Sequence, residues 1–208
     1  MTRVKVCGIT DLGDALAALD AGADLLGFNF YLRSPRYITP AEARKIVECI
    51  PEGTSCVGVF VNEPAPAEVE RIAREAGLGA VQLHGDETPE YCRSLRGLTT
   101  IKALRVGADY TPEAAAAYGT DAVLLDAYVA GERGGTGHTF DWALATQTRE
   151  RVPRLFLAGG LNPDNVASAV AAVGPYVVDV CSGVETSPGR KSPELLRRFV
   201  EQAKSSRQ

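Results

Sequence analysis

Short apolar runs alternate with longer amphipathic segments along the whole chain. Each apolar run has four to six residues, which is the length of a buried strand. We predict eight strands, at Val4–Cys7, Leu25–Phe30, Cys56–Val61, Ala80–His84, Thr100–Leu104, Ala122–Asp126, Arg154–Ala158 and Val177–Cys181.

The segments between these runs are rich in alanine and have the spacing of amphipathic helices. Several begin with proline or with a capping Asp, Thr or Ser, as helix starts do. The clearest predicted helices are Asp14–Ala21, Pro40–Cys49, Pro66–Ala76, Pro89–Leu95, Thr111–Tyr118, Asn165–Val173 and Pro193–Ala203, with Thr10 or Asp11 as the cap of the first. Strands that alternate with helices form parallel βαβ units.

Two architectures fit this alternation, an open doubly wound sheet and a closed (β/α)8 barrel. Eight repeats of roughly 25 residues reach the lower size limit of a barrel. The glycine-rich turns follow the seventh and eighth runs, where barrels bind phosphate, and not the first run, where the dinucleotide fingerprint stands. We therefore predict an α/β protein with a single (β/α)8 TIM-barrel domain over residues 1–208.

Charge and composition narrow the class of partner. The net charge is -4 and the pI about 5.3, which argues against nucleic acid. No apolar run is long enough to span a membrane, and Arg3, Lys5 and Gly8 interrupt the first apolar residues, so no signal peptide is predicted. Five scattered cysteines without a C-x-x-C pair indicate a reduced, cytoplasmic protein without a zinc site.

Two reactive side chains stand at predicted strand ends, where α/β enzymes carry their chemistry. Cys7 ends the first run and Asp126 ends the sixth. Burial of an unpaired carboxylate is costly, so Asp126 must be paired, protonated or at the barrel mouth. A structural ion pair of Asp126 with Lys5 or Arg105 is the alternative.

Further candidates lie at other strand ends. His84 shares a strand face with Gln82 and could bind substrate or transfer a proton, or simply bond within its loop. In the segment after the second run, Arg33 or Arg36 could bind a carboxylate, the alternative being a surface arginine.

Glycines predict an anion site at the late strands. Gly159, Gly160, Ser182 and Gly183 are expected to offer adjacent backbone N–H groups for a phosphate at a helix N-terminus. A flexible loop that contains Gly131, Gly134, Gly135 and Gly137 follows the sixth run, and it lacks the G-K-[ST] ending of a P-loop.

Lys5 and Asp179 alternate with Cys7 and Cys181 on the first and eighth runs, so all four can face the interior. Lys5 could form a Schiff base with a carbonyl substrate. We prefer a structural Lys5–Asp179 pair, because an aldolase lysine would not need Cys7 and Asp126.

The motifs together resemble those of phosphoribosylanthranilate isomerases. In family order they are K-V-C-G-I-T, R-S-P-R-Y, Q-L-H-G-D-E, L-L-D, G-G-T-G-x-T-F-D-W, L-A-G-G-L-N-P-x-N-V and D-x-x-S-G-V-E-x-x-P-G-x-K. The resemblance implies a (β/α)8 barrel of tryptophan biosynthesis. It implies the Amadori rearrangement of N-(5-phosphoribosyl)anthranilate to 1-(2-carboxyphenylamino)-1-deoxyribulose 5-phosphate, without cofactor or metal.

The resemblance also implies residue roles. Cys7 matches the general base, Asp126 the general acid and Arg36 the residue that meets the anthranilate carboxylate. The remaining substrate-binding candidates are His84, Gly137, Gly159, Gly160, Asp179, Ser182 and Gly183. Asn29 and Cys181 depart from the family pattern, in which an apolar residue and serine are common.

We consider two alternative interpretations. The protein could be another phosphosugar barrel, either an epimerase or a Schiff-base aldolase using Lys5 or Lys102. It could also be a barrel that only binds phosphoribosyl compounds. We expect a monomer, with a homodimer as the alternative.

Overall fold

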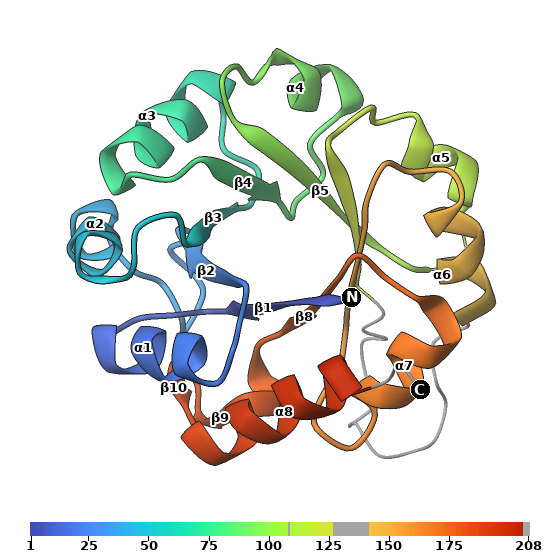
Figure 1. The fold of residues 1–208 in the computed structure, drawn as a ribbon. Coiled ribbons are helices and arrows are strands. Elements are labelled where there is room, and N and C mark those ends of the chain that lie inside the picture. Colours follow the sequence, from blue (N-terminus) through green and yellow to red (C-terminus); the bar gives the residue numbers. More distant parts are fainter. Residues whose placement is uncertain (108, 127–141, 206–208) are drawn as a thin grey trace.

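Eight parallel strands close into a barrel in chain order, with β8 paired to β1. The computed structural model describes residues 1–107, 109–126 and 142–205. The closed ring confirms the predicted barrel, and the open sheet is wrong (Figure 1). The strands are β1 (Arg3–Cys7), β2 (Leu25–Asn29), β3 (Ser55–Phe60), β4 (Ala80–Leu83), β5 (Thr99–Arg105), β6 (Ala122–Asp126), β7 (Leu155–Ala158) and β8 (Val177–Val180).

Helices form an outer layer around this ring (Figure 1). Asp11 caps the first of them, since its Oδ1 accepts from the Asp14 N–H at 3.0 Å, and Thr39 and Glu42 form a capping box on the second. The helices are α1 (Leu12–Asp20), α2 (Pro40–Cys49), α3 (Pro66–Ala76), α4 (Pro89–Ser94), α5 (Pro112–Ala116), α6 (Trp142–Arg149), α7 (Val166–Val173) and α8 (Pro193–Ser205).

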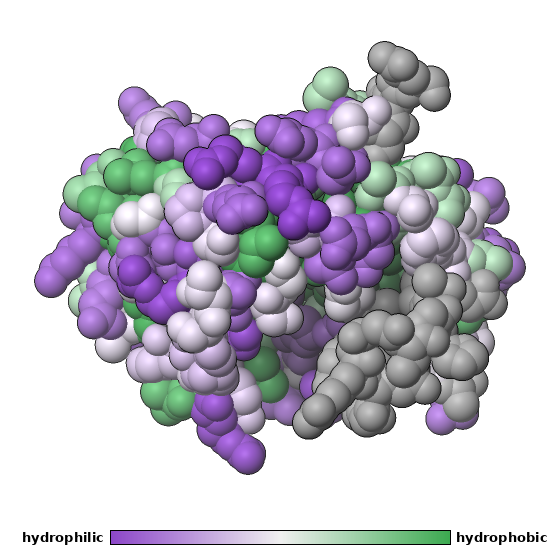
Figure 2. All heavy atoms as spheres, turned by 90° about the horizontal axis from the view of Figure 1, so that it is seen from below, coloured by the Kyte–Doolittle hydropathy of each residue, from purple (hydrophilic) through white to green (hydrophobic). Residues whose placement is uncertain are grey.

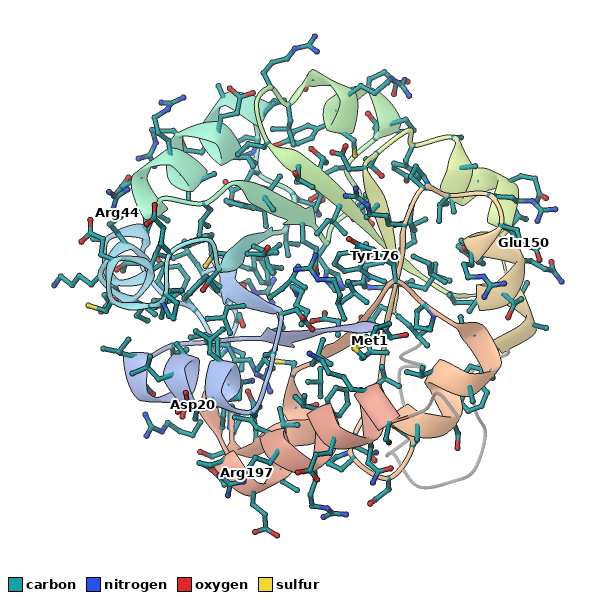
Figure 3. The ribbon with its side chains drawn as sticks, viewed as in Figure 1. Met1, Asp20, Arg44, Glu150, Tyr176 and Arg197 are labelled. Atoms are coloured by element: carbon teal, nitrogen blue, oxygen red, sulfur yellow. The ribbon has the colours of Figure 1, made fainter. Side chains whose placement is uncertain are left out.

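Alternation along each strand separates two kinds of residue. On β1, Val4 and Val6 join the core between strands and helices, whereas Lys5 and Cys7 belong to the opposite face. Apolar side chains such as Leu124 and Phe156 fill part of the barrel interior. Figure 3 shows side chains inside the ring, while Asp20, Arg44 and Arg197 lie on the surrounding helices.

A two-stranded hairpin, which the sequence pattern did not predict, follows β8. A 3-10 turn (Ser182–Val184) leads into β9 (Glu185–Ser187), which pairs with β10 (Arg190–Lys191). The hairpin is fastened to the start of α1: Thr10 Oγ1 donates to the Gly189 carbonyl at 2.7 Å, and the Lys191 N–H donates to Asp14 Oδ2 at 2.8 Å. This docking brings the hairpin next to the end of β1.

None of the helices in the described ranges is long and apolar enough to cross a bilayer. On the face drawn in Figure 2, hydrophilic residues predominate and hydrophobic ones form small separate patches.

Candidate active site

A cavity of about 250 Å³ opens at the carboxyl ends of the strands. It is lined by the predicted site residues Cys7, Arg36, His84, Asp126, Gly159, Gly160, Asp179 and Ser182, together with Asn29, Val59, Gln82, Ala158, Leu161 and Cys181. Gly137 and the other glycines of its loop lie outside the described residues. The sequence therefore located eight of these residues. Strands and their ends account for Cys7, His84, Asp126 and Asp179, whereas Arg36, Gly159, Gly160 and Ser182 lie in the connections after β2, β7 and β8.

Cys7 is buried at the end of β1, and its surroundings favour the thiolate. A hydrogen bond from the Cys181 thiol is the largest cause. Burial opposes ionisation, but the charges of Lys5 and Lys191 add to the hydrogen bond, and the pKa of Cys7 lies well below its usual value. The hydrogen bond to Cys7 and burial raise the pKa of the Cys181 thiol, which favours Cys181 as the protonated partner.

Lys5 and Asp179 form the predicted interior ion pair, with Nζ 2.9 Å from Oδ1. Burial opposes the charge on Lys5, but Asp179 and Cys7 outweigh it and the pKa of Lys5 is raised. Burial, only partly offset by Lys5, raises the pKa of Asp179 to about 7. Lys5 is thus held as a cation beside Cys7, which disfavours the neutral amine that a Schiff base requires.

Asp126 connects through His84 to Gln82. Asp126 Oδ2 lies 3.3 Å from His84 Nε2, and His84 Nδ1 lies 2.9 Å from Gln82 Nε2. The Gln82 amide is buried, and its Oε1 has no hydrogen-bond partner among the described residues. Asp126 is partly open to the cavity, with 22% of its side chain exposed. The alternative of a structural Lys5–Asp126 pair is not what the geometry shows, since Lys5 bonds Asp179.

Arg36 is the arginine that reaches the cavity, whereas Arg33 is exposed to solvent. Its Nε and Nη2 donate to Glu185 Oε1 and Oε2 at 2.8 and 2.6 Å. Glu185 is nearly buried and also accepts from Lys191 Nζ at 2.9 Å. Burial opposes its charge, but Arg36 and Lys191 hold the pKa of Glu185 below its usual range.

The loops after β7 and β8 leave backbone donors open. Gly159 and Gly160 have φ of 91° and 66°, a conformation that suits glycine, and they precede α7 in a loop instead of standing at its first turn. Among the described residues, no hydrogen bond uses the N–H of Gly159, Gly160 or Ser182. These cavity-lining donors can meet an anion.

Gly183 is not among the residues that line the cavity. A Cβ at Gly183 would lie 2.0 Å from the Leu161 carbonyl oxygen, so glycine is required where the β8 loop crosses the β7 loop. Gly183 thus lets the two loops lie against each other.

The last family motif contains Glu185 and Lys191, but the sequence analysis gave neither residue a role in the site. The available signal was Pro188-Gly189 between them, since this dipeptide marks a turn that sets flanking residues opposite each other. In the described part of the chain, no group of three or more His, Cys, Asp or Glu side chains could hold a metal ion.

Comparisons with known proteins agree with this geometry. The model of the N-(5'-phosphoribosyl)anthranilate (PRA) isomerase family matches residues 4–202. A curated isomerase of that name from Trichlorobacter lovleyi is 50% identical over 206 residues, covering 99% of this chain and all of the relative.

Solved structures extend the match to three dimensions. The phosphoribosylanthranilate isomerase of Thermotoga maritima superposes with a TM-score of 0.91 at 46% identity, covering 99% of this chain and all of that one. A phosphoribosylanthranilate isomerase in complex with reduced 1-(o-carboxyphenylamino)-1-deoxyribulose 5-phosphate matches with a TM-score of 0.88 at 44% identity, with the same coverage. The chain therefore belongs to the phosphoribosylanthranilate isomerase family.

Proposed function

We propose that this isomerase of tryptophan biosynthesis rearranges N-(5-phosphoribosyl)anthranilate by acid–base catalysis, with Cys7 as the base and Asp126 as the acid. The observation that carries the proposal is that both groups line one cavity, from β1 and β6, and that the surroundings of Cys7 favour its thiolate. A base and an acid on separate walls can act on two atoms of one substrate.

The chemistry then needs two proton transfers. The Asp126 carboxyl donates its proton to the ring oxygen, the bond from this oxygen to C1′ breaks, and a protonated Schiff base forms. The Cys7 thiolate removes the acidified C2′ hydrogen and leaves an enolamine. Tautomerisation moves the O2′ hydrogen to C1′ and yields the ketone. One proton passed from Cys7 to Asp126 through solvent restores the starting state.

Two anion sites would orient the substrate between these groups. Arg36 would meet the anthranilate carboxylate, because a guanidinium matches planar anions. The N–H groups of Gly159, Gly160 and Ser182 would meet the phosphate, and the proposal also includes Gly137 and Gly183 in the phosphate loops and His84 and Asp179 in the wall. The hydrogen bond between His84 and Asp126 would orient the acid.

The test is a fluorescence assay that follows the loss of phosphoribosylanthranilate. Cys7→Ala and Asp126→Asn should each lower kcat by about 10²–10⁴-fold while substrate still binds. Arg36→Ala should chiefly raise KM. Cys49→Ala, which removes an exposed cysteine of α2, is the matched control and should keep wild-type rates. A near-native kcat in either of the first two variants would contradict the assignment.

The Schiff-base aldolase has less support. Lys5 is fully buried and paired with Asp179, and Lys102 is 1% exposed and paired with Glu87 at 2.6 Å. Borohydride trapping of either lysine with substrate would favour this second activity.

The proposal also places the protein in the cytoplasm, without nucleic acid or membrane partners. All five cysteines are free, as in a reducing compartment. We propose that the protein is a monomer. In the described part of the chain, few large hydrophobic residues are exposed (Met1, Leu16, Leu32 and Tyr176), which supports this state. The homodimer is favoured instead by a relative of 44% identity, solved as monomers of the dimeric isomerase of Thermotoga maritima.

A further inference from the structure

Lys191 and Glu185 of the β9–β10 hairpin have buried side chains. Lys191 contacts Cys7, and Glu185 contacts Arg36. We propose that Lys191 is a positioning residue that holds Cys7 as a thiolate, and that Glu185 couples Lys191 to the carboxylate-binding Arg36. The inference rests on the role proposed above for Cys7, and it gives the hairpin a part in catalysis.

The ammonium of Lys191 is bonded to both thiol-bearing residues. Its Nζ lies 2.5 Å from the Cys7 carbonyl oxygen and 3.3 Å from that of Cys181. The Cys181 Sγ is 3.9 Å away. Glu185 is the third partner, and the Lys191 side chain is completely buried, so its ammonium has no access to water. The positive charge of Lys191 at this position favours the thiolate of the neighbouring Cys7 over its neutral thiol.

Glu185 divides its carboxylate between two cations. Its Oε2 accepts from Arg36, while its Oε1 accepts from Arg36, from Lys191 and, at 3.2 Å, from the Gly189 N–H. The forked contact fixes the plane of the Arg36 guanidinium. Glu185 therefore sets the position of Arg36, which would hold the substrate carboxylate. It also sets the position of Lys191, which lies next to Cys7.

Charged groups of both signs surround the two thiols. Lys5, Arg36 and Lys191 pair with the carboxylates of Asp179 and Glu185. A further carboxylate, Asp14 of α1, accepts the backbone N–H of Lys191. Of the three cations, Lys191 contacts the Cys7 carbonyl directly, so its removal is the change that tests the proposal.

Fastening the hairpin does not require this lysine side chain. The hairpin is already attached through Thr10 to the Gly189 carbonyl and through the backbone N–H of Lys191 to Asp14. A buried ion pair contributes little net stability compared with apolar packing, because desolvation offsets its attraction. Two attachments of the hairpin are therefore independent of the Lys191 charge.

The experiment measures the thiolate directly. Wild type and Lys191→Met are treated with iodoacetamide from pH 4 to 9, and peptide mapping quantifies alkylation at Cys7. The pH of half-maximal alkylation should rise in the variant, so that alkylation at the wild-type midpoint slows by about fivefold, the effect of about one pH unit. The rates should converge at alkaline pH, and the acidic limb of kcat/KM should move by the same amount.

Lys204→Met is the matched control, since Lys204 of α8 also binds a carbonyl, that of Gly22, and a carboxylate, that of Asp24. It should leave the alkylation profile of Cys7 unchanged. An unchanged profile in Lys191→Met would overturn the proposal. If this profile moves while Cys7→Ala keeps full activity, the effect on the thiolate stands and the proposed function fails.

Glu185→Gln gives an independent reading that does not depend on the folding of Lys191→Met. It removes a negative charge and keeps the shape, so Cys7 should be alkylated at least as fast as in wild type. KM should rise by roughly threefold to tenfold, because Arg36 loses its charged partner. Slower alkylation in Glu185→Gln would show that packing, and not charge, controls the thiol, and would also overturn the proposal.

Discussion

Cys7 ends β1, and Cys181 directly follows the neighbouring strand β8. The register pairs Val6 with Val180, so the two cysteines follow one step later on the interior face. A hydrogen bond from the Cys181 thiol is the largest cause of the lowered pKa of Cys7, and the Cys181 Sγ also lies 3.9 Å from Glu185 Oε1. A serine at position 181 would keep a hydrogen-bond donor toward Cys7, whereas an alanine would not.

This reading predicts a difference between two substitutions of Cys181. Cys181→Ala removes the donor, so the pKa of Cys7 should rise and kcat/KM should begin to fall at a higher pH as the solution is acidified. A hydrogen bond to a charged group is worth about 1.5–3 kcal/mol, so alkylation of Cys7 on the acidic side should slow by about tenfold or more. Cys181→Ser should stay near wild type in pH-dependent alkylation. Equal profiles for the two variants would contradict the role of the donor.

At the level of elements, the apolar runs predicted the strands within one or two residues. β6 was predicted at its observed bounds, and α2 and α3 likewise. The pattern could not reveal the β9–β10 hairpin, because strands of three and two residues carry no periodicity. Without the hairpin, the sequence could not place Glu185 and Lys191 against Arg36 and Cys7, although both residues stand in the last family motif.

β2 approaches β1 at Gly27, the register partner of Cys7. A Cβ at Gly27 would lie 2.8 Å from the Cys7 Sγ, 3.1 Å from its Cα and 3.2 Å from the Lys5 Cε. The Cys7 Cα cannot move away from this Cβ, because β1 and β2 are hydrogen-bonded to each other. Gly27→Ala should therefore displace the sulfur and lower kcat by about tenfold to a hundredfold, with a loss of about 1–3 kcal/mol in the free energy of unfolding.

The comparison for Gly27→Ala is Gly79→Ala at the entry to β4, where a Cβ meets no atom within 4 Å. Kinetics in the fluorescence assay and urea unfolding of both variants separate a local clash from a general intolerance of alanine. Wild-type kcat in Gly27→Ala would show that β1 and β2 adjust more freely than their register indicates.

For the whole molecule, closure of the ring makes every strand depend on its two neighbours. α8 packs against β1 and α1, so the end of the chain covers its beginning (Figure 1). The helix buries Leu196, Phe199, Val200 and Ala203. Each large apolar side chain contributes about 1.5–3 kcal/mol, a substantial part of the stability of an ordinary domain. The single-domain organisation over residues 1–208 stays a prediction, and this helix offers a way to test it.

Phe199→Ala should lower the free energy of unfolding by about 3–5 kcal/mol, because it opens a cavity under α8. Leu16→Ala on α1, where 39% of the leucine is exposed, should change it by no more than about 0.5 kcal/mol. If the barrel is one cooperative unit, circular dichroism and the exposure of the buried Cys92 to a thiol reagent should report the same urea midpoint in both variants. Cys92 lies on α4, in a different part of the ring from α8, so its early or late exposure would show that the two halves unfold separately. In Phe199→Ala we expect both urea midpoints to fall together. This result requires that the pairing of β1 with β8 spreads the loss of stability under α8 over the whole ring.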